Sequence, residues 1–431
     1  MIGPSHPGSY TRRWVDDELD ELIADGAAAI VVEGAKAVGK STTATARVET
    51  VWALDQPAVR ELVAADPVRV LGSESVLIDD WQHVPAVWDA VRRAVDNGAS
   101  PGQILLTGSA TPIDHGTHSG AGRIITLRMR PMTLPERGVS EPTVSIRGLL
   151  AGSRDPVGGT SNVDLSVYAD EILRSGFPAI RAGGDRVRRA QLRGYIDRVI
   201  DRDIADMVGT RVRNVAALRR WLTAYAAATA TTASYEQIRD AATSGDGDKP
   251  ARSTTQPYRD ALEALFILEP LAAWEPSRNP LSELTRTPKH HLVDPALAAS
   301  LLRVDAGALL TDDTGPAPIP RDGSLFGALF ESLVTQTLRV GAQRAESSCG
   351  HLRTQRGEHE VDVIVERADG RVIAFECKLS ASVNDADVRH LHWLADRIGS
   401  DLLDAVVVTT GPQAYRRPDG IAVVPLALLG A

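Results

Sequence analysis

The 431-residue sequence predicts an α/β protein made of three successive regions. Residues 1–150 alternate short apolar runs with helical patterns, which is typical of a parallel sheet whose strands are joined by helices. Residues 163–310 have mainly helical patterns, and residues 323–431 return to strands and helices that form a separate α/β unit. Polar segments rich in Gly, Ser or Pro separate the three regions.

Composition indicates a globular protein of the cell interior. Hydrophobic residues make up 43% of the chain, charged residues 24%, and the net charge is −9. This charge argues against a protein that coats nucleic acid non-specifically, although a local basic groove stays open. Two cysteines are too few for a metal cluster and fit a reducing compartment. No run approaches the ~18 apolar residues of a membrane span, so we expect a cytoplasmic protein without a membrane partner.

The first region contains a complete phosphate-binding loop motif. Residues 34–41 fit GxxxxGK[ST] at every fixed position, between the apolar run 27–32 and a helix-forming segment. In that context the backbone wraps a triphosphate, Lys40 reaches its β- and γ-phosphates, and the Ser41 hydroxyl takes one position on Mg²⁺. We therefore predict ATP and Mg²⁺ as cofactors. The predicted nucleotide-binding residues are Gly34, Ala35, Lys36, Ala37, Val38, Gly39, Lys40, Ser41 and Thr42.

Two further strands of this region end in polar residues. Residues 76–82 form an apolar strand that runs into Asp79 and Asp80, the Walker B pattern. Asp79 is predicted to hold Mg²⁺, directly or through water, and Asp80 to orient the attacking water. Because Asp80 is shorter than the usual glutamate, hydrolysis is expected to be slow. Ser109 is at the end of the strand 104–109, the place where AAA+ proteins, which this pattern resembles, keep a sensor that hydrogen-bonds water or the γ-phosphate.

The helical middle region offers two features that the sequence leaves ambiguous. Arginines are dense between Arg186 and Arg220 and alternate with aspartates, so both an ion-paired helix face and a phosphate-binding surface stay open. Residues 234–268 have the outline of a winged helix: a helix, a polar loop (244–253), a second helix and an apolar strand. Such modules bind DNA or serve as packing units.

The C-terminal region carries acids in the D…ExK pattern of restriction-endonuclease-like nucleases. A turn at residues 368–370 would place Asp362 opposite Glu376, with Lys378 on the same sheet face. A divalent ion between the two acids could activate water, with Lys378 positioning or deprotonating it. Glu331, in the preceding amphipathic helix, matches the helix acid of these nucleases. A surface hairpin that carries the same residues by chance is the alternative.

At these residues the chain resembles prokaryotic AAA+ ATPases fused to a C-terminal domain of unknown function with a nuclease-like, PD-(D/E)XK fold. The resemblance implies a P-loop NTPase domain, and it makes Arg123 the arginine nearest the γ-phosphate, acting in cis or on a neighbouring subunit of a homo-oligomer. A structural salt bridge of Arg123 is the alternative. The marks of the resemblance are Arg12-Arg13, Gly34–Thr42, Ile78–Gln82, Leu106–Ser109, Gly122-Arg123, Leu127–Met132, Gly176–Pro178, Tyr195–Asp203, Pro288-Lys289, Leu292–Asp294 and the C-terminal acids.

Two classes of function follow from the sequence. In the first, the protein is an ATP-driven, metal-dependent nuclease or remodeller of DNA or RNA. In the second, ATP controls partner binding and the nuclease-like domain is catalytically inactive. The four acid and base positions in the C-terminal region favour the first class, and the aspartate at position 80 favours the second.

Overall fold

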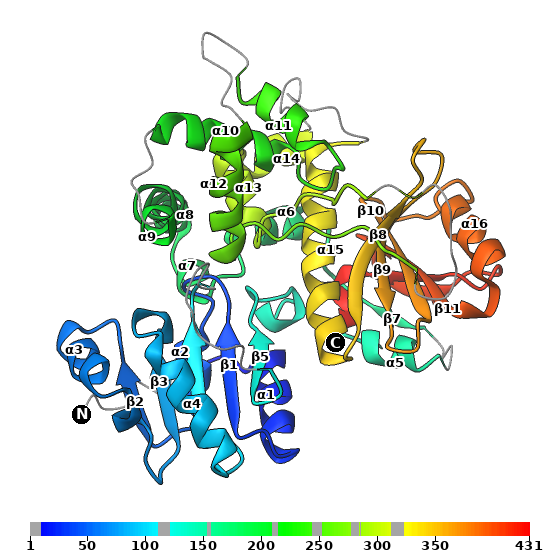
Figure 1. Ribbon diagram of the computed structural model, residues 1–431. Coiled ribbons are helices and arrows are strands. Elements are labelled where there is room, and N and C mark those ends of the chain that lie inside the picture. Colours follow the sequence, from blue (N-terminus) through cyan, green and yellow to red (C-terminus); the bar gives the residue numbers. More distant parts are fainter. Residues whose placement is uncertain are drawn as a thin grey trace. The chain divides into compact units, whose positions relative to one another are not determined.

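The computed structural model of the chain describes residues 10–110, 121–152, 157–208, 214–243, 252–276, 284, 286–311 and 323–431. The chain forms two compact units, whose elements are labelled in Figure 1. The first unit comprises Met1–Arg130 and Asp260–Ile267, and the second comprises Pro131–Arg259 and Leu268–Ala431. The first unit therefore ends before the sequence-predicted boundary at residue 150, and the middle and C-terminal regions share one unit.

The first unit contains the parallel sheet that the sequence predicts. Its five strands lie in the order β2-β3-β4-β1-β5, and every neighbouring pair is parallel. The strands are β1 (Ala29–Glu33), β2 (Thr50–Ala53), β3 (Val76–Asp79), β4 (Ile104–Gly108) and β5 (Ile124–Arg128). The helices are α1 (Trp14–Ala24), α2 (Lys40–Thr45), α3 (Pro57–Ala65) and α4 (Ala86–Asp96). All strand carboxyl ends therefore meet at one edge, where ligands of such sheets gather.

The strands of this sheet are apolar because helices cover it. Val31, Ile78 and Leu106, from three neighbouring strands, have no exposed surface and share one core with Val87 and Val91 of α4. Strands buried on both faces read as continuous apolar runs rather than alternating patterns. The burial of the three central strands β3, β4 and β1 therefore explains their short apolar runs, whereas the edge strands β2 and β5 are partly exposed.

The second unit begins with a helical part. Its helices are α6 (Leu165–Arg174), α7 (Pro178–Arg181), α8 (Asp185–Arg198), α9 (Ile204–Val208), α10 (Val215–Ala227), α11 (Tyr235–Ala241), α12 (Arg252–Ala264), α13 (Pro295–Leu302) and α14 (Ala306–Thr311). The end of α12, from Asp260 on, belongs to the first unit. Side-chain caps fix several starts: Asp164, Asn214, Ser234 and Asp294 each accept a hydrogen bond from a first-turn N–H group. Among the described residues, no helix is both long and apolar enough to cross a membrane.

The segment expected to form a winged helix contains the two helices α11 and α12. Most of its polar loop lies outside the described residues. After α12, Leu268 and Leu271 form antiparallel bridges with Leu292 and Lys289. This pairing places Lys289, which is 1% exposed, inside the second unit.

A seven-stranded mixed sheet forms the C-terminal part, in the order β7-β12-β13-β11-β10-β9-β8. Its strands are β7 (Gly159–Thr160), β8 (Ser348–Arg353), β9 (Glu360–Glu366), β10 (Val372–Lys378), β11 (Leu402–Thr409), β12 (Gln413–Arg416) and β13 (Ala422–Pro425). The helices α15 (Leu325–Arg344) and α16 (Arg389–Ile398) lie on either side of it (Figure 1).

The stretch before the helical part is tied to this C-terminal sheet. Strand β7 pairs with β12, and β6 (Val144–Ser145) pairs with β14 (Leu429–Gly430). Between them, α5 (Ile146–Ala151) contacts α15 and β11. Residues 144–160 therefore belong to the second unit, which explains why the first unit ends earlier than the sequence suggests.

The hairpin of β9 and β10 has the predicted register. Its ladder runs from Val372 opposite Glu366 to Phe375 opposite Val363, so paired numbers sum to twice 369. One step further along the same register, Asp362 faces Glu376. The amide N–H of Cys377 donates to Asp362 Oδ2 at 2.9 Å, which holds that carboxylate at the hairpin end.

Candidate functional sites

The phosphate-binding loop follows β1 at the carboxyl edge of the first sheet. A Cβ atom at Gly34 would lie 2.1 Å from the backbone oxygen of Met129, so only glycine fits there. Gly39 has a φ of 111°, which side chains rarely allow. Gly39 also caps α2 without a side-chain hydrogen bond, so the N–H groups of the first turn are left for phosphate oxygens.

Lys40 is buried at the start of α2 and spans this loop. Its Nζ donates to the backbone oxygens of Gly34 and Ala35, at 2.9 Å each. Burial lowers the pKa of Lys40 to about 8, against the raising effects of Asp80 and Asp79. The ammonium is thus held where a triphosphate carries its negative charge, and phosphate oxygens would restore its charged form.

Asp79 joins the phosphate-binding loop to the middle of the sheet. Its Oδ1 accepts hydrogen bonds from the Ser41 hydroxyl, at 2.7 Å, and from the Thr107 hydroxyl. Carboxylate and hydroxyl oxygens are the hard ligands that Mg²⁺ prefers. Ser41 and Asp79 therefore fit the predicted metal position, where Mg²⁺ would offset phosphate charge when bound. Sequence reasoning missed Thr107, although its place at the end of β4 was a signal.

Asp80 and Ser109 come together as the sequence predicts, with Gln82 between them. Gln82 Nε2 donates to Asp80 Oδ1 at 3.0 Å and to Ser109 Oγ at 3.1 Å, and Ser109 Oγ lies 3.3 Å from Asp80 Oδ1. Asp80 has left-handed backbone angles (φ 54°), and its N–H donates to Thr107 Oγ1 at 3.2 Å. Such a conformation is costly for a non-glycine residue and is typical of functional positions.

The position of Arg123 favours the salt-bridge alternative over action on the nucleotide of its own chain. In the parallel pair β1–β5, Ala29 aligns with Ile124 and Glu33 with Arg128. Arg123 therefore lies at the amino edge of the sheet, whereas the phosphate-binding loop leaves the carboxyl edge, roughly 16 Å away for five residues at ~3.3 Å each. Its Nε pairs with Asp96 Oδ1 at 2.6 Å instead. Arg123 thus lies away from the nucleotide site of its own chain.

Action of Arg123 on a neighbouring subunit stays a prediction. If it holds, a mixture of Arg123→Ala and Lys40→Ala subunits should recover some ATP hydrolysis, because an intact nucleotide site would meet an intact arginine. Steady-state turnover of the mixture, compared with each variant alone, tests this. Specific activity that does not depend on protein concentration, from a strictly monomeric protein, would contradict it.

Two other arginines support the nucleotide site and were not singled out by sequence reasoning. Arg128, at the carboxyl end of β5, lies with its guanidinium carbon 3.5 Å from the Phe266 ring centroid and acts electrostatically on Lys40. Arg13, 4% exposed, donates to the backbone oxygen of Val38 in the loop at 3.2 Å and to that of Arg130 at 2.9 Å. Both belong to segments that the sequence marked only by family resemblance.

In the second unit, Lys289 lies among the acids that the sequence assigned to a metal. Its Nζ is 2.7 Å from Asp362 Oδ1, 2.8 Å from Glu331 Oε1 and 2.9 Å from Glu360 Oε1. Burial alone would lower the pKa of Lys289, but Asp362, Glu331 and Glu360 hold it well above its usual value. Lys289 therefore stays charged among these three acidic side chains.

The acids around Lys289 differ in their charge state. Burial opposes ionisation of Asp362, but the Lys289 ammonium and the Cys377 N–H group hold its pKa below the usual value. Burial raises the pKa of Glu331 to about 8 and that of Glu376 well above its usual range. Glu376 Oε1 has no hydrogen-bond partner among the described residues, and Glu376 Oε2 lies 3.8 Å from Lys378 Nζ.

A divalent cation does not fit this cluster while Lys289 stays in place. The Lys289 ammonium and the raised pKa of Glu376 already relieve the expected repulsion between Asp362 and Glu376. In the part of the chain that the structure describes, no group of three acids, histidines or cysteines is arranged to hold a metal ion. Lys289 was missed because it lies far from the acids in sequence, although Pro288-Lys289 was a mark of the resemblance.

Family models of known proteins match three successive segments of the chain. A family model described as an AAA domain matches residues 27–137. The first unit carries a P-loop ATPase domain. Two domains of unknown function follow, DUF8612 at residues 166–308 and DUF4143 at residues 326–429. The nucleotide-site residues of the first sheet all fall inside the first match.

Curated relatives and a solved structure were also found. The uncharacterized proteins Rv2008c of Mycobacterium tuberculosis and Mb2031c of Mycobacterium bovis are each 26% identical to the chain over 323 residues. The match covers 74% of this chain and 62% of each relative, so the chain spans about three fifths of their length. A Walker-type ATPase of Pyrococcus abyssi is similar at 15% identity and a TM-score of 0.37, over 69% of this chain and 99% of that one.

Proposed function

We propose that the first unit binds ATP with Mg²⁺ and hydrolyses it slowly. The observation that supports this is the pair of contacts at one sheet edge: Ser41 with Asp79, and Ser109 with Asp80. Lys40 lies beside both acids, close enough for each to act on its pKa. These are the groups that phosphoryl transfer requires for charge stabilisation and for orienting water.

Each side chain has a separate task in this proposal. Lys40 and the loop N–H groups hold the β- and γ-phosphates, and Ser41 with Asp79 would hold Mg²⁺. Asp80 accepts a proton from the attacking water or orients it, and Gln82 and Ser109 keep its carboxylate in place. Gln82 and Ser109 both contact Oδ1 of Asp80, whose side chain is shorter than the usual glutamate. We therefore expect slow turnover.

Replacing Asp80 with asparagine tests this assignment. Asp80→Asn should keep ATP affinity within a few-fold of wild type and lower kcat by about 100-fold or more, the usual contribution of a general base. The measurements are calorimetric titration with ATP and steady-state phosphate release. Asp55→Asn, an exposed aspartate of the same unit, is the matched control and should change neither. Wild-type turnover in Asp80→Asn would exclude the role.

For the second unit, we infer a binding function controlled by ATP, in preference to cleavage. Residues 323–431 keep the mixed sheet and the acids expected of a restriction-endonuclease-like domain, which supports the proposal of that ancestry. Lys289 favours the inactive form, because its ammonium already contacts Glu331, Glu360 and Asp362 at the place where a metal ion would bind. A nuclease would need that charge to be exchanged for a metal ion. DNA or RNA remains the proposed partner.

A further inference from the structure

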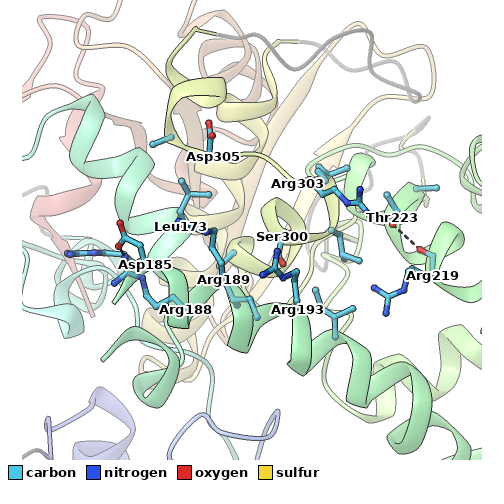
Figure 2. A pocket seen from close by; sticks show the side chains of 18 of the residues that line it. Leu173, Asp185, Arg188, Arg189, Arg193, Arg219, Thr223, Ser300, Arg303 and Asp305 are labelled. Carbon is cyan, nitrogen blue, oxygen red and sulfur yellow. Dashed lines mark hydrogen bonds and ion pairs between the residues drawn. The ribbon is translucent and has the colours of Figure 1, made fainter. Parts of the chain in front are cut away.

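A large hollow lies in the helical part of the second unit (Figure 2). Its volume is about 1490 Å³, and residues of α6, α8, α10, α11, α13 and α14 line it. Among the described residues, seven arginines and three aspartates contribute to the lining. The whole lining falls within residues 166–308, the match to DUF8612, for which no function is described. A basic surface is thus concentrated in one place on a chain whose net charge is −9.

The arginines of this hollow fall into two groups. Arg174 pairs with Glu171, Arg188 with Asp185, and Arg219 with Asp197, as expected for an ion-paired helix face. The second group comprises Arg189, Arg193, Arg220 and Arg303, which are exposed and whose guanidinium groups make no hydrogen bond or salt bridge to any residue that the structure describes. Figure 2 shows Arg189, Arg193 and Arg303 around the hollow, with Ser300 among them.

The chemistry of the lining selects an extended phosphate-bearing ligand. Guanidinium groups match phosphate oxygens in a bidentate geometry and stay charged at every physiological pH. The hollow is larger than the ~300–1000 Å³ of ordinary small-molecule pockets. No aromatic side chain is part of the described lining, so bases have no surface on which to stack. The ligand is therefore held through a row of phosphates rather than through bases.

We propose that this hollow binds the phosphodiester backbone of a nucleic acid strand or duplex without reading its sequence. This proposal rests on the binding function that we infer for the second unit, and it names the class of partner. Binding of this kind is dominated by counterion release, so its affinity falls steeply with salt. Each arginine that contacts a phosphate adds about one unit to that salt dependence.

The test compares two double variants of the full-length chain that remove the same charge from the same helix. Arg189→Ala with Arg193→Ala removes two unpaired arginines of the hollow. Arg186→Ala with Arg198→Ala removes two exposed arginines of α8 that do not line it. Fluorescence anisotropy with a labelled DNA duplex, a DNA single strand and an RNA strand of one sequence gives Kd at several salt concentrations.

The first double variant should weaken binding by tenfold or more and reduce the slope of log Kd against log salt by about two. The control double variant should change both much less. Equal effects of the two double variants would overturn the proposal, as would binding of inorganic polyphosphate without binding of any strand.

ATP titration of the same preparations separates this proposal from the proposed ATP function of the first unit. Normal ATP binding without strand binding overturns this one alone, and strand binding without ATP binding overturns only the ATP function.

Discussion

Replacing Lys289 with alanine is expected to create a divalent-cation site in the second unit, at the place that the Lys289 ammonium occupies. The variant leaves Glu331, Glu360 and Asp362 facing one another without the ammonium that contacts all three. Breaking a buried ion pair in this way costs about 3–5 kcal/mol. The metal-free variant should therefore melt at a lower temperature, and Mn²⁺ or Mg²⁺ should recover much of the loss, as any ligand of the folded state does.

The measurement is a thermal melt of each full-length variant in EDTA, Mg²⁺ and Mn²⁺. Lys378→Ala is the matched control, because Lys378 lies 3.8 Å from Glu376 but does not bridge the three acids; it should gain no metal response. Adding Asp362→Asn to Lys289→Ala should remove the response again. Melts of the wild-type protein show whether the acid cluster binds a metal ion even if Lys289→Ala fails to fold. Strong metal stabilisation of the wild type, lost in Asp362→Asn, would restore the nuclease assignment.

Replacing Lys40 with alanine is expected to abolish ATP binding, with a loss of about 100-fold or more in affinity. The variant removes a buried cation from a loop built around phosphate oxygens, and charge-assisted hydrogen bonds of this kind are the strong ones. Calorimetric titration measures the loss, with Arg69→Ala, an exposed cation of the same unit, as control. Equal ATP affinity in wild type and Lys40→Ala would contradict the assignment of this loop as the nucleotide site.

The same lysine makes ATP binding depend on pH. Since burial lowers the pKa of Lys40 to about 8, the free protein loses this charge above pH 8, and binding must then take up a proton. Affinity should fall by up to about tenfold per pH unit above that value. ATP titrations in two buffers of different ionisation enthalpy measure this proton uptake.

The lowered pKa of Lys40 also affects folding stability. Between pH 8 and the higher pKa of an unfolded lysine, the unfolded state binds more protons than the folded state, so the contribution of Lys40 to stability rises with pH.

The sequence alone determined those features whose geometry is local or follows from strand order. The glycine-rich motif carries its own backbone geometry, and parallel strands bring their carboxyl ends to one edge, so Asp79, Asp80 and Ser109 could be grouped before any coordinates existed. The turn at residues 368–370 set the register of β9 and β10 for the same reason, since pairing in a hairpin follows from its turn.

Only the tertiary structure decided what occupies the C-terminal acid cluster and what lines the arginine-rich hollow. Lys289 arrives from a segment that pairs with Leu271, far along the chain from Asp362, and a D…ExK pattern does not reveal whether a metal or an ammonium balances it. The neighbouring arginines Arg219 and Arg220 of α10 likewise read alike in sequence, and only helix packing places Asp197 of α8 against Arg219. In both cases the physical reason is the same: a buried or clustered charge is defined by partners that distant segments supply.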